Sequence, residues 1–358
     1  MRPTARLHKL GQSLWVDNIT RTMLEDGTLA RYIDEFSVTG LTSNPTIFDK
    51  AIGAGAAYDE QIAELQGRGM EGEELFFELA LTDLRRAARL FEPINRRTDD
   101  VDGWVSLEVS PLYADDAEAT LAQARDLHRR AACNIYIKIP GTEAGRAAIE
   151  ESIFAGVPIN VTLLFSPDHY LGAAEAFMRG VERRVEAGLD PSVPSVASLF
   201  VSRWDVAVAD AVPSELRNRL GVAVAKRTYR VYRELLDSER WQRLANEGTR
   251  PQRLLWASTG TKDPEVPEVL YIEALTAPLT ISTMPEKTLL AFADHGEVGE
   301  QLPADGGDAE ATLAEFVAAG VNVAGLAERL QREGADAFSA SWRDLLDSVA
   351  AKRERLSA

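Results

Sequence analysis

Cysteine is almost absent from this sequence, and long apolar runs are missing altogether. The 358 residues include one cysteine, Cys133, which excludes an internal disulfide and leaves no cysteine cluster for a zinc site. No apolar run reaches the length that spans a membrane, and residues 1–10 lack the apolar core of a signal peptide. The composition therefore predicts a cytoplasmic protein without a metal site, in which Cys133 is a small buried residue.

Positive charge is also scarce. The 39 lysine and arginine residues are outnumbered by 56 aspartates and glutamates, giving a formal net charge of −17. Nucleic acids and anionic membranes carry phosphate groups that such a chain repels, so we expect neither as a partner. An anionic ligand would need a local group of arginine or lysine side chains. Hydrophobic residues, at 45%, are in contrast plentiful enough for a large core.

Short apolar segments alternate along the whole chain with longer amphipathic ones. Eight of them have the length and composition of β-strands, at residues 14–19, 37–42, 104–109, 134–139, 159–165, 196–201, 254–258 and 279–283. Eight strands alternating with helices predict an α/β fold, a single (β/α)8 TIM barrel over residues 1–358. Residues 285–358 are predicted to add C-terminal helices, which either cover the barrel mouth or form an oligomer contact.

The connecting helices are predicted from apolar residues at helical spacing. Thr142 and Glu143 are predicted to begin one of them. Ser166 is positioned as the N-cap of the next helix, and Pro167 follows at the first helical position. The predicted helices cover residues 47–66, 73–91, 114–132, 142–156, 166–188, 286–293, 309–319 and 335–355.

A lysine near the end of the fourth predicted strand is the main candidate for chemistry. Isoleucines occupy one face of residues 134–139, and Lys138 lies on the other, because side chains alternate along a strand. Strands of a parallel barrel are buried on both faces, so an ammonium there must pair with a carboxylate or lose its proton. The free amine can attack a carbonyl carbon and form a Schiff base. Lys138 is therefore either a nucleophile or a strand-end lysine that reaches solvent or forms an ion pair.

Polar groups end other predicted strands on the same inward face. Asp17 lies opposite aliphatic residues of the first strand, Glu108 opposite those of the third, and Thr162 shares a face with Asn160 on the fifth. Active sites of (β/α)8 barrels lie where the strands end, so these groups are expected to meet Lys138. An amine, two carboxylates and a hydroxyl suit Schiff-base chemistry, which needs several proton transfers. The alternative is that one carboxylate only neutralises Lys138.

Cations and hydroxyls follow the sixth and seventh predicted strands. Arg203 comes after the sixth, and Ser258 and Lys262 after the seventh. The C-terminal ends of the later strands of such barrels commonly bind phosphate, and these side chains are suited to that role. Each cation taken alone is also compatible with a solvated surface position.

The histidines and Tyr136 are expected to be structural. Tyr136 shares a face with Lys138 but precedes it by two residues, which places it deeper in the barrel. The histidines have no partner pattern and are expected at structural or surface positions, at residues 8, 128, 169 and 295.

Five segments in this order resemble the transaldolases, particularly their longer bacterial branch. They are Trp-Val-Asp at 15–17, Thr-Gly-Leu-Thr-Ser-Asn-Pro-Thr at 39–46, Ser-Leu-Glu-Val-Ser at 106–110, Ile-Lys-Ile-Pro-Gly-Thr at 137–142 and Ile-Asn-Val-Thr-Leu at 159–163. With the later strands, the resemblance spans nearly the whole chain.

The resemblance implies an enzyme of the non-oxidative pentose phosphate pathway. Lys138 would form a Schiff base with fructose 6-phosphate or sedoheptulose 7-phosphate, and Asp17 would take the C4 hydroxyl proton as the C3–C4 bond breaks. Glu108 and Thr162 would position a water that relays protons. The dihydroxyacetone unit would pass to glyceraldehyde 3-phosphate or erythrose 4-phosphate, without any cofactor because the protonated imine is the electron sink.

The resemblance also implies the residues that bind substrate. Asn44, Asn160 and Ser198 would hold the dihydroxyacetone hydroxyls, and Arg203 and Ser258 the phosphate. The sequence departs from the family pattern at two positions here. Gly260 stands where an arginine is common, which leaves Lys262 as the nearest cation for the phosphate, and Ser202 stands where a glycine is frequent.

Two other functions stay open. A fructose-6-phosphate aldolase would release free dihydroxyacetone. Enzymes of that kind, however, have shorter chains than this one and carry glutamine at the position of Glu108. A non-catalytic barrel that binds sugar phosphates would not need Lys138, Asp17 and Glu108 together. The protein is expected to be a monomer or a homodimer.

Overall fold

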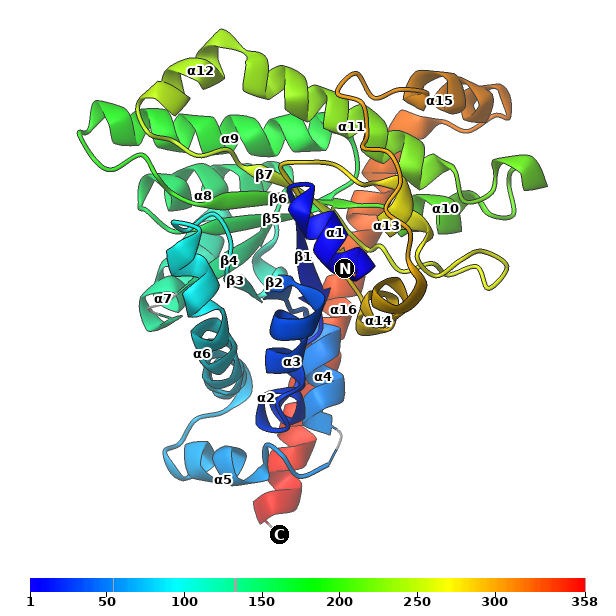
Figure 1. Ribbon diagram of the computed structural model, residues 1–358. Coiled ribbons are helices and arrows are strands. Elements are labelled where there is room, and N and C mark those ends of the chain that lie inside the picture. The colour runs from blue at the N-terminus through cyan, green and yellow to red at the C-terminus, as the bar shows by residue number, and fades with distance from the viewer. Residues whose placement is uncertain (54, 132–133, 358) are drawn as a thin grey trace.

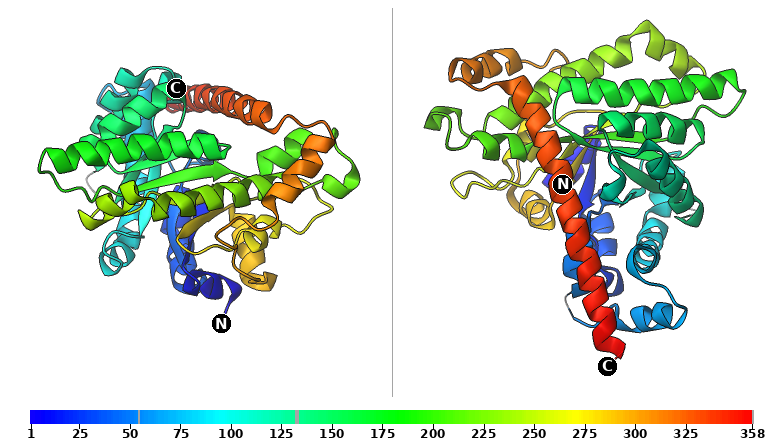
Figure 2. Two further views of the ribbon diagram at one scale, coloured as in Figure 1. Left: turned by 90° about the horizontal axis from the view of Figure 1, so that it is seen from above. Right: turned by 180° about the vertical axis from the view of Figure 1, so that it is seen from behind.

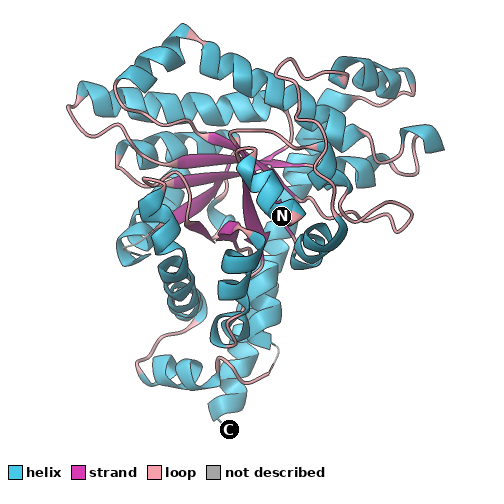
Figure 3. Cartoon of the chain, in the orientation of Figure 1, coloured by secondary structure: helices cyan, strands magenta, loops and turns pink. Residues whose placement is uncertain are grey.

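Eight parallel strands close into a barrel at the centre of the computed structural model (Figures 1 and 3), which describes residues 1–53, 55–131 and 134–357. Each strand pairs with the next in the chain, and β8 pairs with β1. The strands lie within two residues of the predicted segments, so the predicted fold class is confirmed. They are β1 Gln12–Asp17, β2 Val38–Thr42, β3 Trp104–Glu108, β4 Ile135–Pro140, β5 Ile159–Leu164, β6 Ser195–Phe200, β7 Arg253–Ala257 and β8 Thr280–Met284. Cys133 lies outside the described residues.

Helices surround the strands (Figure 3). The predicted N-cap at Ser166 is confirmed, because its hydroxyl accepts a hydrogen bond from His169 N at 3.1 Å. The helix predicted to begin at Thr142 is also present, and the Thr142 hydroxyl caps it by accepting from Gly145 N at 3.1 Å. The helices are α1 Pro3–Lys9, α2 Arg21–Glu25, α3 Thr28–Phe36, α4 Pro45–Gly53, α5 Asp59–Gly67, α6 Gly72–Arg97, η1 Pro111–Tyr113, α7 Ala117–Ala131, α8 Glu143–Phe154, α9 Pro167–Glu186, α10 Ser202–Val208, η2 Ser214–Leu216, α11 Leu220–Asp237, α12 Glu239–Asn246, α13 Leu270–Ala274, α14 Glu286–His295, α15 Ala309–Ala318 and α16 Val323–Ser357.

Three predicted helices have wrong bounds, one of them the helix over residues 73–91, which continues to Arg97 as α6. Residues 47–66 form α4 and α5 instead of one helix, and Gly55 between them has a φ of 74°, a left-handed conformation that a right-handed helix cannot continue through. The last helix begins at Val323 instead of residue 335 and runs for 35 residues. The division of the chain into a barrel and an extension over residues 285–358 stays a prediction.

Aromatic rings fill part of the barrel interior. The ring of Tyr136 stacks on Trp104, with 4.4 Å between centroids, and lies 6.0 Å from Trp15. Gly40 on β2 makes room for these rings, since a Cβ there would lie 2.5 Å from Trp15 Nε1. Tyr136 is fully packed, as predicted. The barrel interior is thus filled with packed side chains at the level of Tyr136.

Helix α16 crosses the barrel on the side opposite the N-terminal helix α1 (Figure 2). Its C-terminal part packs against α4, α5 and α6, where Trp342 contacts Phe76 and Phe77 with ring centroids 5.1 and 5.6 Å apart. Among the described residues, no single helix is long and apolar enough to cross a membrane, and α15 and α16 meet that criterion only together, as a pair bent by 91°.

A buried lysine attaches the end of α16 to the region between α4 and α5. Lys352 is only 4% exposed, and its Nζ forms an ion pair with Asp59 Oδ1 at 2.8 Å. The same Nζ donates hydrogen bonds to the carbonyl oxygens of Ile52, at 2.8 Å, and Gly55, at 2.6 Å. Lys352→Met should lower the free energy of unfolding by about 3 kcal/mol, because a carboxylate and two carbonyls lose their partner. Urea unfolding measures this change.

The matched control is Lys50→Met, since Lys50 is an exposed lysine of α4. Its unfolding free energy should stay within about 0.5 kcal/mol of the parent value. Equal losses in both variants would contradict the anchoring role of Lys352.

Candidate active site

The register of the barrel places Lys138 between two polar residues of neighbouring strands. Glu108 of β3 pairs with Lys138 of β4, and Lys138 pairs with Asn160 of β5. Lys138 is 6% exposed, and its Nζ lies 3.4 Å from both Glu108 Oε2 and the carbonyl oxygen of Ser43. The predicted inward direction of Lys138 is confirmed, and the amine has a carboxylate beside it that can exchange protons with it.

Glu108 is buried beneath the cavity at which the strands end. Burial raises the pKa of its carboxyl, an effect that Lys138 opposes and Asp17 adds to. Apart from the ion pair with Lys138, neither carboxylate oxygen has a hydrogen-bond partner among the described residues, and the same holds for the hydroxyl of Thr162. Both side chains therefore have free capacity to bind a water.

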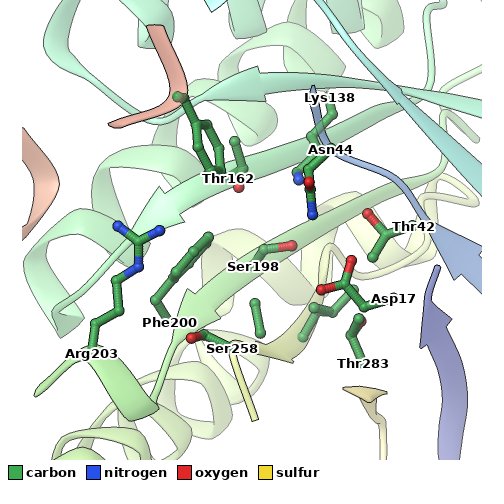
Figure 4. A pocket seen from close by; sticks show the side chains of 13 residues that line it. Asp17, Thr42, Asn44, Lys138, Thr162, Ser198, Phe200, Arg203, Ser258 and Thr283 are labelled. Carbon is green, nitrogen blue, oxygen red and sulfur yellow. The ribbon is translucent and has the colours of Figure 1, made fainter. Parts of the chain in front are cut away.

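Asp17 ends strand β1 and points into the same space (Figure 4). Burial raises the pKa of this carboxyl, and the positive charges of Lys138 and Lys262 partly offset the increase. A carboxyl with a raised pKa is a stronger base once it is ionised, so Asp17 suits proton transfer to and from a substrate hydroxyl.

Hydrogen bonds fix the amide of Asn160. Its Nδ2 donates to Ser106 Oγ at 3.1 Å, and its Oδ1 accepts from Ser198 Oγ at 2.7 Å. This chain crosses from β3 through β5 to β6 and orients Ser198 at the cavity wall.

A cavity of about 140 Å³ collects most of the predicted residues (Figure 4). Seven of the ten predicted site residues line it: Asp17, Asn44, Lys138, Thr162, Ser198, Arg203 and Ser258. Glu108 and Asn160 are buried behind the lining, in contact with Lys138 and Ser198. The remaining lining residues are Thr42, Phe200, Leu255, Ala257, Thr283 and Phe338.

Arg203 lies at the opposite end of the cavity from Lys138 (Figure 4). It belongs to α10, and its guanidinium carbon is 5.4 Å from the centroid of the Phe200 ring. Ser258 has a left-handed φ of 56°, and its hydroxyl is hydrogen-bonded to that of Ser202 at 2.8 Å. Ser202, which stands where a glycine is frequent in the family pattern, therefore supports the position of Ser258.

Lys262 does not line this cavity. It borders a separate surface depression, together with Arg217 and Asp263. The loop after β7 carries its side chain away from the lining, although its charge still acts on Asp17. Lys262 therefore does not lie where it would directly contact a phosphate bound in this cavity.

The C-terminal helices were predicted either to cover the barrel mouth or to form an oligomer contact, and α16 does border the cavity, but the residue that it contributes was not predicted. Phe338 of α16 lines the cavity, and the centroid of its ring is 5.5 Å from Lys138 Nζ. Helical spacing indicates which face of α16 is buried but not what this face covers. His169 is buried and structural, since its Nδ1 accepts from Phe165 N at 3.2 Å and its Nε2 lies 3.0 Å from Glu328 Oε1 of α16.

The arrangement can bind a ketone that carries an anionic tail. The amine lies at one end, with one carboxylate beneath it and another across the cavity, and the guanidinium lies at the other end. Imine formation and later proton transfers are within reach of these groups. Among the described residues, no three histidine, cysteine or carboxylate side chains gather in a way that could hold a metal ion.

Comparison with known proteins gives a consistent assignment. A family model described as Transaldolase/Fructose-6-phosphate aldolase matches residues 14–349. A protein of a Parafrankia species named transaldolase is 42% identical over 367 residues, covering 100% of this chain and 99% of the relative. A transaldolase of Thermobifida fusca is 44% identical over 360 residues, covering 97% of each. The chain therefore belongs to the transaldolase/fructose-6-phosphate aldolase family.

Proposed function

We propose that this chain is a transaldolase that moves a dihydroxyacetone unit from a ketose phosphate to an aldose phosphate. The observation that carries the proposal is the placement of Lys138 between Glu108 and Asp17 in a cavity that has Arg203 at its far end. Sedoheptulose 7-phosphate and fructose 6-phosphate are the proposed donors, and glyceraldehyde 3-phosphate and erythrose 4-phosphate the acceptors.

The first steps form the imine. The free amine of Lys138 adds to the ketone carbon, and the carbinolamine loses water to give a protonated imine. Glu108 lies beside the nitrogen, and the Thr162 hydroxyl lines the same cavity, so these two groups are suited to hold the water that carries protons between the nitrogen and the leaving oxygen.

Carbon–carbon cleavage follows on the other side of the cavity. The ionised carboxylate of Asp17 takes the proton from the C4 hydroxyl, the C3–C4 bond breaks, and its electron pair moves into the imine to form an enamine. The aldose phosphate then leaves. Asn44, Asn160 and Ser198 hold the hydroxyls of the three-carbon unit, with Asn160 acting partly through its hydrogen bond to Ser198.

Arg203 is proposed to bind the phosphate with Ser258, and Lys262 adds positive charge beside the mouth. Arg203→Leu should raise the KM for fructose 6-phosphate roughly 10- to 100-fold with a smaller loss in kcat, because a charge-assisted contact outside the reacting bonds is lost. Steady-state kinetics give both values. The KM for unphosphorylated fructose is the control and should not change; an equal rise for both sugars would place Arg203 elsewhere in the mechanism.

The test of the proposed function uses the wild-type protein. It is incubated with fructose 6-phosphate and erythrose 4-phosphate, and sedoheptulose 7-phosphate and glyceraldehyde 3-phosphate are measured. Borohydride reduction with the donor alone should leave an adduct on Lys138, located by peptide mapping. Release of free dihydroxyacetone without transfer would favour the fructose-6-phosphate aldolase function. Absence of turnover and of an adduct would favour a sugar-phosphate-binding protein.

A cytoplasmic location and a monomeric or homodimeric state also stay proposals. Size-exclusion chromatography with light scattering tests the second of these.

A further inference from the structure

An aromatic ring from the C-terminal helix forms one wall of the cavity at the reacting nitrogen. The centroid of the Phe338 ring lies 5.5 Å from Lys138 Nζ and 6.4 Å from that of Phe200 at 62°, an edge-to-face contact. Phe165 continues the row, at 5.3 Å from Phe200. The amine that forms the imine therefore has the Glu108 carboxylate on one side and an apolar aromatic wall on another.

Helix α16 holds Phe338 in place through residues on the same face, one and two turns earlier. Gln331 Nε2 donates to the carbonyl oxygen of Leu163 at 2.9 Å, where β5 bulges and Leu163 has a φ of 60°. Gly334 allows the close approach, since a Cβ there would lie 2.9 Å from Leu163 Cδ2. The helix is thus fixed to the strand that carries Thr162.

The reaction contains one species that needs protection from solvent. After cleavage, the enamine on Lys138 waits for an acceptor while the part of the cavity near Arg203 has lost its sugar phosphate. Resting on the proposed function, we propose that Phe338 shields this enamine from solvent protons and so sets the ratio of transfer to hydrolytic release of dihydroxyacetone.

The competing release is a defined pair of steps. A proton from solvent adds to the enamine carbon, and the electron pair of the carbon–carbon double bond forms the new C–H bond, which regenerates the protonated imine. One water then adds to the imine carbon, and the C–N bond breaks. The products are dihydroxyacetone and the ammonium of Lys138, so one proton and one water are consumed and no oxidant or reductant is needed.

Truncation of Phe338 should affect release more than transfer. Hydrolysis of the product ketose imine is already part of the normal cycle, and Glu108 and Thr162 are positioned to serve it. Protonation of the enamine is outside that cycle, and it depends on how well solvent is excluded from the carbon. A smaller side chain at position 338 opens that route while leaving the groups that form the imine unchanged.

The experiment compares the wild-type protein with Phe338→Leu and Phe338→Ala. Free dihydroxyacetone and sedoheptulose 7-phosphate are measured with fructose 6-phosphate at several erythrose 4-phosphate concentrations. The ratio of release to transfer should rise at least about tenfold in the alanine variant and less in the leucine variant. In heavy water without acceptor, the rate at which deuterium enters the dihydroxyacetone carbon should rise in parallel.

The control is Trp342→Phe, one turn later on α16, which loosens packing on Phe76 without reaching the cavity lining. It should lower the thermal unfolding temperature while leaving the release-to-transfer ratio at the wild-type value. An unchanged ratio in both Phe338 variants, with wild-type transfer intact, overturns this inference alone. A wild-type protein that shows no transfer overturns the proposed function instead.

Discussion

Lys138→Ala should abolish turnover, with a loss in kcat on the order of 10⁵-fold or more, as expected when the covalent nucleophile of an enzyme is removed. The variant should also leave no borohydride-trapped adduct with fructose 6-phosphate. Other groups of the cavity, including Arg203, remain, so the sugar phosphate should still bind. Coupled kinetics, mass spectrometry and calorimetric titration separate these three results.

Two further variants make the Lys138 result specific. Lys138→Arg keeps the positive charge beside Glu108 but offers no free amine at neutral pH, so it should be as inactive as the alanine variant. Lys9→Ala removes an exposed lysine of α1 and should leave turnover and trapping unchanged. Near-normal activity in Lys138→Arg would mean that the reaction does not pass through an imine on this residue.

The placement of Lys138 was predictable because a strand has a strict period of two. Isoleucines at 135, 137 and 139 point to the helices, and this fixes Lys138 on the inward face. The same alternation places Asp17, Glu108 and Thr162, and all eight strands were located within two residues. Strand ends of a closed parallel barrel meet at one edge, so inward polar groups near those ends gather without further information.

Loops and helix starts were less predictable, since no strict period governs them. Lys262 follows β7 by only a few residues, yet its loop directs it away from the cavity lining. Gly334 carries the ordinary helix cost of a glycine, which favours a helix that begins after it. In the structure α16 continues through Gly334, and the missing side chain lets the helix approach Leu163 closely. The role of Phe338 therefore depends on a long-range contact that local pattern does not specify.

Asp17→Asn should separate imine formation from carbon–carbon cleavage. The amide has the shape of the carboxylate but cannot take the C4 hydroxyl proton, so transfer should fall roughly 10²- to 10⁴-fold. Lys138 and Glu108 are unchanged, so borohydride should trap the intact six-carbon sugar and little of the three-carbon fragment. Glu108→Gln is the matched comparison, because it should slow the appearance of any adduct instead of changing its mass.

The pH profile gives a second test of Asp17. Burial raises the pKa of its carboxyl, and the proposed base is the ionised form. Cleavage in the wild-type protein should therefore increase with pH through a pKa above that of an ordinary aspartate, and fall as the carboxylate is protonated at lower pH. The single-turnover cleavage rate of Asp17→Asn should lack this rise. If the same rise persisted in Asp17→Asn, the titrating group would be another residue, and the buried Glu108, whose pKa is also raised, would become the candidate.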